Sequence, residues 1–170
     1  MKKLLLISVA IILVSATAFG QKTKVKAVKK PLAKKAAVFT REKFDPKRDP
    51  KLDLATAILT ASKSGKRIIL DVGGEWCGWC IHMDKFLFSN KALDKLRKNN
   101  FVWIKINMSP ENENLAFLSE YPEIKGYPHL FVLDESGTLL HSQDTVALEK
   151  DETYNLAKFT EFLKLWSPKK

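Results

Sequence analysis

Hydrophobic residues along this chain recur at two spacings, one helical and one strand-like, and the two alternate. Apolar side chains at helical spacing occupy residues 54–61, with Asp53 in position to cap the start and Ser64-Gly65 to end the pattern. Ile68–Val72 is a short apolar run, rich in β-branched residues, that lies before Gly73-Gly74. These patterns predict a helix followed by a buried strand.

The rest of the chain continues this alternation. Two helices are predicted next, one from Cys77 to Phe88 and one from Ser89-Asn90 to Asn99-Asn100, followed by a strand over 101–106. A short helix from Pro110 to Tyr121-Pro122 then precedes a hairpin, with strands over 129–133 and 138–141 around a turn at 134–137. The last element is a helix with the apolar stripe Leu156, Phe159, Phe162, Leu163 and Trp166. Strands that alternate with crossover helices need a sheet covered on both faces, and the hairpin adds an antiparallel strand at one edge. The predicted fold class is therefore α/β.

The first twenty residues have a different character. Lys2 and Lys3 precede an apolar run over 4–14, in which Ser8 is the one polar residue, and the segment ends in Ala18-Phe19-Gly20. This is the pattern of a secretory signal peptide, and the run is shorter than the roughly 18 to 20 residues that span a bilayer. We therefore expect residues 1–20 to be removed, which leaves a periplasmic or secreted protein. Retention of the segment as a membrane anchor is the alternative.

The net charge of +10 comes mainly from one segment. Residues 21–49 hold eleven Lys or Arg and three acids, whereas residues 50–170 hold sixteen of each. We interpret residues 21–50 as a flexible basic tether and residues 51–170 as one folded, monomeric domain. Nucleic-acid binding is not expected, because the lysines of residues 21–37 have no aromatic residue among them. Weak contact with an anionic surface is the functional alternative for the tether.

The chain has only two cysteines, Cys77 and Cys80, and they are separated by Gly78 and Trp79. A pair so close in sequence closes too small a loop to stabilise the fold much, which points to chemistry instead. A cysteine at a helix start is stabilised as a thiolate by backbone N–H groups and by the helix dipole. We therefore expect Cys77 to attack a partner disulfide and Cys80, one turn deeper, to resolve the mixed disulfide. No cofactor beyond this dithiol is expected.

A single acid, Asp71, interrupts the apolar run of the first strand, six residues before Cys77. Burial raises the pKa of a carboxyl group, so Asp71 is a candidate proton acceptor for Cys80. A carboxyl group held in this way is a net cost to the fold at neutral pH. The substitution Asp71→Asn is therefore expected to hold or raise the stability.

These residues resemble the active-site segment of the thioredoxin superfamily, and Met83-Asp84 and Phe88-Ser89-Asn90 look most like the thioredoxin-related proteins of bacterial envelopes. The likeness lies in Leu70-Asp71 followed by Glu75-Trp76-Cys77-Gly78-Trp79-Cys80, in Lys105-Ile106-Asn107, and in Ile124-Lys125-Gly126-Tyr127-Pro128. The similarity covers roughly residues 52–166. It implies a thioredoxin-like fold, with a central mixed sheet and helices on both faces.

The resemblance also assigns roles to residues around the pair. Lys105 is expected near Asp71 as its buried partner, and Pro128 is expected as a cis-proline that faces the cysteines. The residues expected to contact a client are Trp76, Gly78, Trp79, Tyr127 and Pro128. The implied activity is exchange with protein disulfides and dithiols, as a reductase rather than an oxidase, with an unidentified electron donor. Trp79 stands where related branches have proline or histidine, so the direction of electron flow stays open.

A pair of cysteines at this spacing also occurs in metal sites. Zinc sites of this kind need further ligands, and the chain has no second cysteine pair. Copper is the more serious alternative, because His82 follows Cys80 by two residues and His129 directly follows Pro128. The alternative function is therefore a metal-delivery or redox-inert binding module on the same fold. No metal ligand is assigned.

Overall fold

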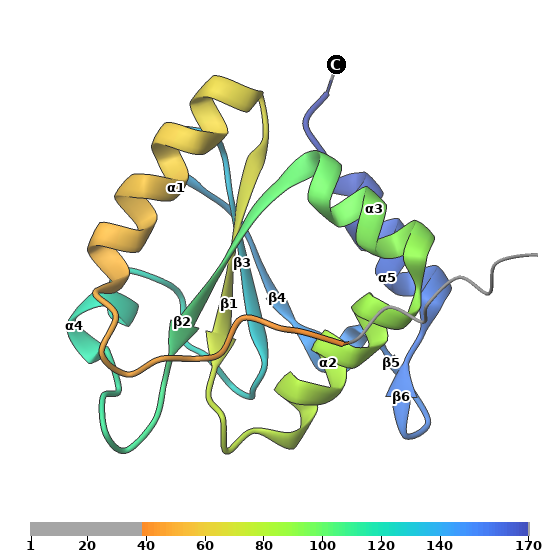
Figure 1. Ribbon diagram of the computed structural model, residues 1–170, viewed down its shortest axis with the longest axis horizontal. Coiled ribbons are helices and arrows are strands. Elements are labelled where there is room, and N and C mark those ends of the chain that lie inside the picture. The colour runs from red at the N-terminus through yellow and green to blue at the C-terminus, as the bar shows by residue number, and fades with distance from the viewer. Residues whose placement is uncertain (1–38, 170) are drawn as a thin grey trace, which may run out of the picture. The chain divides into compact units, whose positions relative to one another are not determined.

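A four-stranded mixed sheet forms the centre of the computed structural model, which describes residues 39–169 (Figure 1). The strands lie in the order β2-β1-β3-β4. β1 (Arg67–Gly73) is parallel to β2 (Phe101–Asn107), β3 (His129–Leu133) is antiparallel to β1, and β4 (Leu139–Asp144) is antiparallel to β3. The predicted fold class, with an antiparallel hairpin at one edge of the sheet, is therefore confirmed.

Helices cover both faces of this sheet (Figure 1). One face carries α1 (Pro50–Ser64) and the short α4 (Leu115–Leu118), which enclose one hydrophobic cluster. The other face carries α2 (Gly78–Ser89), α3 (Lys91–Asn100) and α5 (Leu156–Leu165), which enclose a second cluster. The sheet is therefore buried on both sides.

Strand β1 shows why the sequence requires this arrangement. Ile69 packs on the side of α2, α3 and α5, whereas Ile68, Leu70 and Val72 pack on the side of α1 and α4. Successive side chains of a strand point to opposite faces, so a run without polar alternation must be covered on both. Asp71 is the one charged residue among these positions, and it is fully buried as well.

Helix α1 begins at Pro50, so the prediction of Asp53 as its N-cap is wrong. The cap is Asp49, whose carboxylate accepts hydrogen bonds from the backbone N–H groups of Lys51 and Leu52. Proline suits the first helical position, because the N–H that it lacks would have no partner there. Asp53 lies within the first turn instead.

Two stretches near the ends of strands differ from the predicted elements. Pro110 lies in a turn and does not open a helix, and Asn114, directly before α4, has a left-handed φ of 50° that interrupts any longer helix. After β4, the 3₁₀-helix η1 (Thr145–Leu148) leads into a small hairpin of β5 (Glu149–Lys150) and β6 (Thr153–Tyr154). Strands of two residues are too short to leave a periodic pattern, so the sequence did not predict this hairpin.

The segment over residues 39–49 packs against the domain, so the predicted tether of residues 21–50 is wrong over this part. Phe44 is only 2% exposed. Arg41 forms an ion pair with Glu75. A charged composition favours a solvated chain only while the charges lack partners, and here they have them.

The remaining N-terminal predictions concern the signal peptide over residues 1–20 and the tether over residues 21–38. Both lie outside the residues that the structure describes. Within residues 39–169, no helix combines the length and the apolar character needed to cross a membrane.

Candidate active site

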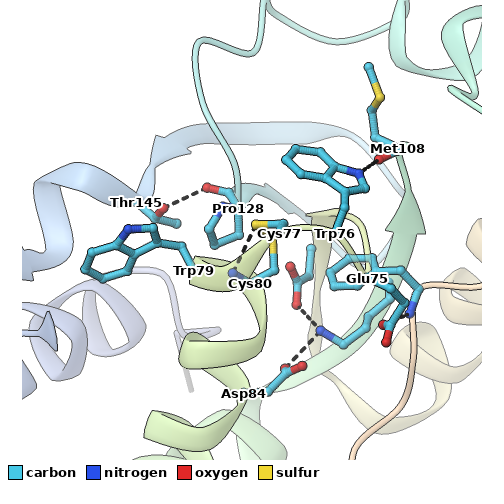
Figure 2. The surroundings of a disulfide bond; sticks show 12 residues. Glu75, Trp76, Cys77, Trp79, Cys80, Asp84, Met108, Pro128 and Thr145 are labelled. Carbon is cyan, nitrogen blue, oxygen red and sulfur yellow. Dashed lines mark hydrogen bonds and ion pairs between the residues drawn. A yellow bond between two sulfur atoms is a disulfide. The ribbon is translucent and has the colours of Figure 1, made fainter. Parts of the chain in front are cut away.

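The two cysteines form a disulfide at the start of α2 (Figure 2). Cys77 is the N-cap residue, and its sulfur accepts a hydrogen bond from the backbone N–H of Cys80 at 3.1 Å. Cys77 is 4% exposed, whereas Cys80 is fully buried. Because N–H groups at a helix start stabilise negative charge on sulfur, the more accessible sulfur is also the one placed to form a thiolate.

The segment expected to face the cysteines lies beside them. The Tyr127-Pro128 peptide bond is cis. Tyr127 packs against the cluster formed by Phe44 and the two cysteines, and Figure 2 shows the Pro128 ring directed at the Cys77 end of the disulfide. The Thr145 hydroxyl donates a hydrogen bond to the Pro128 carbonyl at 2.7 Å, which fixes this part of the backbone.

The two tryptophans next to the disulfide have different surroundings. Trp76 is 56% exposed, and its indole N–H donates to the Met108 carbonyl at 2.7 Å. Its ring meets that of Tyr127 edge to face, with centroids 5.6 Å apart. Trp79 is partly buried, with its ring edge to face with Tyr154 of β6 at 5.4 Å. Trp76 therefore presents the more open aromatic surface, while Trp79 packs against the β5–β6 hairpin.

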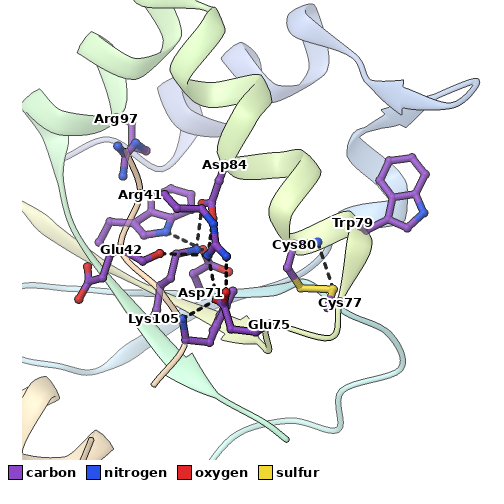
Figure 3. Close-up of polar contacts among 12 residues, drawn as sticks. Arg41, Glu42, Asp71, Glu75, Cys77, Trp79, Cys80, Asp84, Arg97 and Lys105 are labelled. Atoms are coloured by element: carbon purple, nitrogen blue, oxygen red, sulfur yellow. Dashed lines mark hydrogen bonds and ion pairs between the residues drawn. A yellow bond between two sulfur atoms is a disulfide. The ribbon is translucent and has the colours of Figure 1, made fainter. Parts of the chain in front are cut away.

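A buried lysine bridges two carboxylates near Phe44 (Figure 3). The Lys105 Nζ lies 2.8 Å from Asp71 Oδ2 and 2.9 Å from Asp84 Oδ1. The Trp103 indole N–H donates to the same Asp71 oxygen at 2.9 Å. Asp71 and Lys105 are direct partners in the parallel register of β1 and β2. The structure therefore brings together the two charged residues that were expected to pair.

The third member of this cluster is Asp84, which the sequence analysis named only as part of the resemblance and gave no role in the site. Asp84 lies on α2 four residues after Cys80, which places the two side chains on the same face of the helix, one turn apart. Its signal in the sequence is that it is the only acid of this helix. A search for acids one helical turn from either cysteine finds it.

Two charged groups of the cluster, Lys105 and Asp84, have shifted pKa values. Burial on its own lowers the pKa of Lys105, but the charges of Asp71 and Asp84 outweigh burial and raise this pKa above its usual value. Burial also raises the pKa of Asp84, by more than the attraction of Lys105 lowers it. The second carboxylate oxygen of Asp71, Oδ1, is buried and has no hydrogen-bond partner among the described residues. The cluster thus holds a protonated lysine and a carboxylate oxygen available to a proton.

Phe44 is a residue of the site that sequence reasoning missed. It packs with both cysteines in one cluster, and its ring centroid lies 4.2 Å from the Lys105 Nζ. It comes from an irregular, charged segment without apolar periodicity, so no pattern marks it as buried.

Gly73, the last residue of β1, allows a close approach to Cys80. A Cβ atom at this position would lie 2.5 Å from the Cys80 sulfur and 3.1 Å from the Phe44 ring. We therefore expect Gly73→Ala to lower the free energy of unfolding by about 1 to 3 kcal/mol, as overpacking of a core does. Urea unfolding of the oxidised protein measures this change. Gly78→Ala is the control, since a Cβ there meets nothing within 4 Å. Equal losses in the two variants would contradict the close approach.

The two histidines considered as metal ligands are each engaged with a hydroxyl group. His82 Nε2 lies 2.9 Å from Thr153 Oγ1, and His129 Nε2 lies 2.8 Å from Ser142 Oγ. Across residues 39–169, no three His, Cys, Asp or Glu side chains gather as a metal-ligand group. The geometry therefore gives the copper alternative no support.

The fold places Cys77 in a disulfide with Cys80, which is buried beside it, and a disulfide of this kind can exchange with thiols. A disulfide at the start of a helix, on a mixed sheet with helices on both faces, gives the chain a thioredoxin-like architecture. The profile of the thioredoxin-like domain matches residues 54–155, and the chain belongs to that family.

Two similar relatives are bacterial proteins named thiol:disulfide interchange protein DsbD. The protein of Actinobacillus pleuropneumoniae is 30% identical over 98 residues, and that of Colwellia psychrerythraea is 28% identical over 98 residues. Each match covers 57% of this chain and 16% of the relative. The chain therefore spans only a small part of the length of these relatives.

Solved structures share the fold. A disulphide isomerase from Xylella fastidiosa superposes with a TM-score of 0.62 at 21% identity, covering 72% of this chain and 94% of that one. The oxidised C-terminal domain of DsbD from Neisseria meningitidis superposes with a TM-score of 0.53 at 20% identity, covering 74% of this chain and 99% of that one. These likenesses agree with the mixed sheet and its flanking helices.

Proposed function

We propose that this protein reduces disulfide bonds of client proteins in the bacterial cell envelope, with Cys77 as the attacking residue and Cys80 as the resolving residue. The observation that carries the proposal is the unequal placement of the two cysteines at the start of α2: Cys77 is the N-cap residue and is 4% exposed, whereas Cys80 is fully buried one turn further along the helix. The names of the DsbD relatives support exchange between thiols and disulfides.

The reaction transfers two electrons from the dithiol to the client. The Cys77 thiolate attacks one sulfur of the client disulfide, which forms a mixed disulfide and releases the other client sulfur as a thiolate. Cys80 then loses its proton and attacks the Cys77 sulfur. This step releases the second client sulfur, which takes up a proton, and closes the Cys77–Cys80 disulfide seen in the structure.

Asp71 is the proposed acceptor for the Cys80 proton. Its Oδ1 oxygen has no hydrogen-bond partner among the described residues, while Lys105 and the Trp103 indole hold Oδ2. A carboxylate fixed in this way can take a proton without first moving. Lys105 is a positioning residue that keeps the Asp71 side chain in place, and Asp84 holds the lysine from its other side.

A client segment would lie against the exposed surfaces that border Cys77. The proposed contacts are Trp76, Gly78, Trp79, Tyr127 and Pro128. After each turnover the disulfide must be reduced again, so an electron donor that carries a dithiol is required. We further propose that residues 1–20 direct export and that the mature protein acts as a monomer in the periplasm or outside the cell.

The direct test mixes the reduced chain, freed of other thiols, with an equimolar protein that contains disulfides, such as insulin. We expect about one client disulfide to be reduced for each Cys77–Cys80 disulfide formed, because two electrons pass between them. Counting the client thiols by alkylation and mass spectrometry measures this. If no client thiols appear while the dithiol stays reduced, the reductase proposal is wrong.

A further inference from the structure

The segment over residues 39–49 precedes the region that matches the thioredoxin-like domain, yet it contributes side chains to the active site. We propose that Phe44, held by Arg41, seals the resolving cysteine from solvent, so that thiols and disulfides from outside can react only at Cys77. The consequence for client exchange rests on the proposed function, but the seal itself is a property of the folded chain.

The seal is visible in the packing around Cys80. Phe44 is 2% exposed and forms one buried cluster with Cys77 and Cys80. The Phe44 ring also lies so close to Gly73 that a Cβ on that glycine would meet it at 3.1 Å. Cys80 therefore has Phe44 and the end of β1 around its sulfur, and it has no exposed surface of its own.

The same ring covers the polar cluster. The Lys105 Nζ lies 4.2 Å from the Phe44 ring centroid, on the face where an aromatic ring attracts a cation. An apolar ring in this position keeps water from the lysine and strengthens its attraction to Asp71 and Asp84. One side chain thus shields both the resolving sulfur and the groups that manage its proton.

Polar contacts of Arg41 and Phe44 hold the segment in place (Figure 3). Arg41 binds the Glu75 carboxylate with two guanidinium nitrogens, one of them at 2.8 Å, and the Phe44 N–H donates to Glu75 Oε1 at 3.0 Å. Arg41 also lies 3.5 Å from Asp84 Oδ2. A two-pronged arginine contact fixes orientation as well as distance. Because Glu75 lies two residues before Cys77, this contact ties the segment to the active-site turn.

Alkylation of Cys80 tests the seal without any client. In the reduced full chain carrying Cys77→Ser, iodoacetamide can react only at Cys80, whose sulfur displaces iodide to form a thioether. We expect Phe44→Ala to raise this rate at least about tenfold, because a buried thiol becomes accessible. Arg41→Gln should raise it by a smaller factor, since it removes the contact with Glu75 but leaves the ring.

Leu93→Ala is the matched control, because Leu93 is 1% exposed and belongs to the cluster under α3, apart from the one that contains the cysteines. It removes a buried side chain without uncovering Cys80. An unchanged alkylation rate in Phe44→Ala would overturn the proposal. So would an equal rise in Leu93→Ala at a matched melting temperature, since the thiol would then react through global unfolding. Neither result depends on whether the protein reduces clients.

Discussion

Replacing Cys77 by serine is expected to lower disulfide reduction to the rate of a mixture without the protein. Cys80 cannot take over the attack, because it is fully buried. A serine hydroxyl in place of the thiol is too weak an acid to form the nucleophile at neutral pH. The reduction of insulin disulfides with dithiothreitol as electron donor measures this loss.

Cys80→Ser is the matched control for this prediction. It keeps the attacking sulfur and removes the resolving one, so mixed disulfides with clients should accumulate. They are detected on non-reducing gels as larger species that disappear when a reductant is added. If Cys77→Ser traps clients as well as Cys80→Ser does, the assignment of the two roles is wrong.

Asp71→Asn is expected to have the second largest effect, on both stability and rate. The apolar strand pattern by itself suggests a lone carboxyl group whose removal costs nothing. The structure changes that expectation, because Asp71 is the partner of a buried lysine. Removing one member of a buried ion pair costs about 3 to 5 kcal/mol, and we expect about 3 kcal/mol here, since Asp84 still neutralises Lys105. Resolution of the mixed disulfide should slow more than its formation, because only the second step needs the base.

Urea unfolding and rapid-mixing kinetics measure these two effects of Asp71→Asn. Asp94→Asn is the control for stability. Asp94 pairs with Arg97 and Lys98 on α3, and the Lys98 side chain is 63% exposed, so this substitution should cost less than about 1 kcal/mol. An unchanged resolving step in Asp71→Asn would leave Asp71 with a structural role only.

The pH dependence of this ion pair follows from the raised pKa of Lys105. A lysine with a raised pKa contributes stability that is fully present below its usual value of 10.5 and is lost only as the pH rises through the higher value of the folded protein. The stability difference between the parent protein and Asp71→Asn should therefore be fully present at neutral pH.

The parts of the fold that could be predicted are those that repeat along the chain. The buried run in β1 and the helical stripe of α5 each contain enough apolar residues to define a period, so their positions were clear from the sequence. The β5–β6 hairpin has strands of two residues and no period. The start of α1 was predicted wrongly because Asp49 and Asp53 are both suitable N-cap residues, and the helix begins after Asp49.

The residues of the site also differ in how clearly the sequence marks them. Cys77 and Cys80 could be found from their spacing, and Asp71 from its place inside an apolar strand. Lys105 and Pro128 could be found only from the resemblance to a known family, which implies their positions in the fold as well as their residue types. Asp84 is marked in the sequence only as the single acid one helical turn after Cys80, and Phe44 is not marked at all, so the roles of both become evident only in the folded chain. Their importance comes from contacts with residues distant in sequence, such as the 21 residues that separate Asp84 from Lys105.

The reduction potential of the Cys77–Cys80 pair is the measurement that tests the reductase proposal most directly. Equilibration with glutathione redox buffers, followed by alkylation and mass spectrometry, gives the fraction of oxidised chain at each ratio. We predict a potential near that of thioredoxin, about −270 mV, which allows the dithiol to reduce client disulfides. A value near about −120 mV, typical of a strong oxidant, would contradict the account, and so would a pair that fails to exchange with glutathione at all.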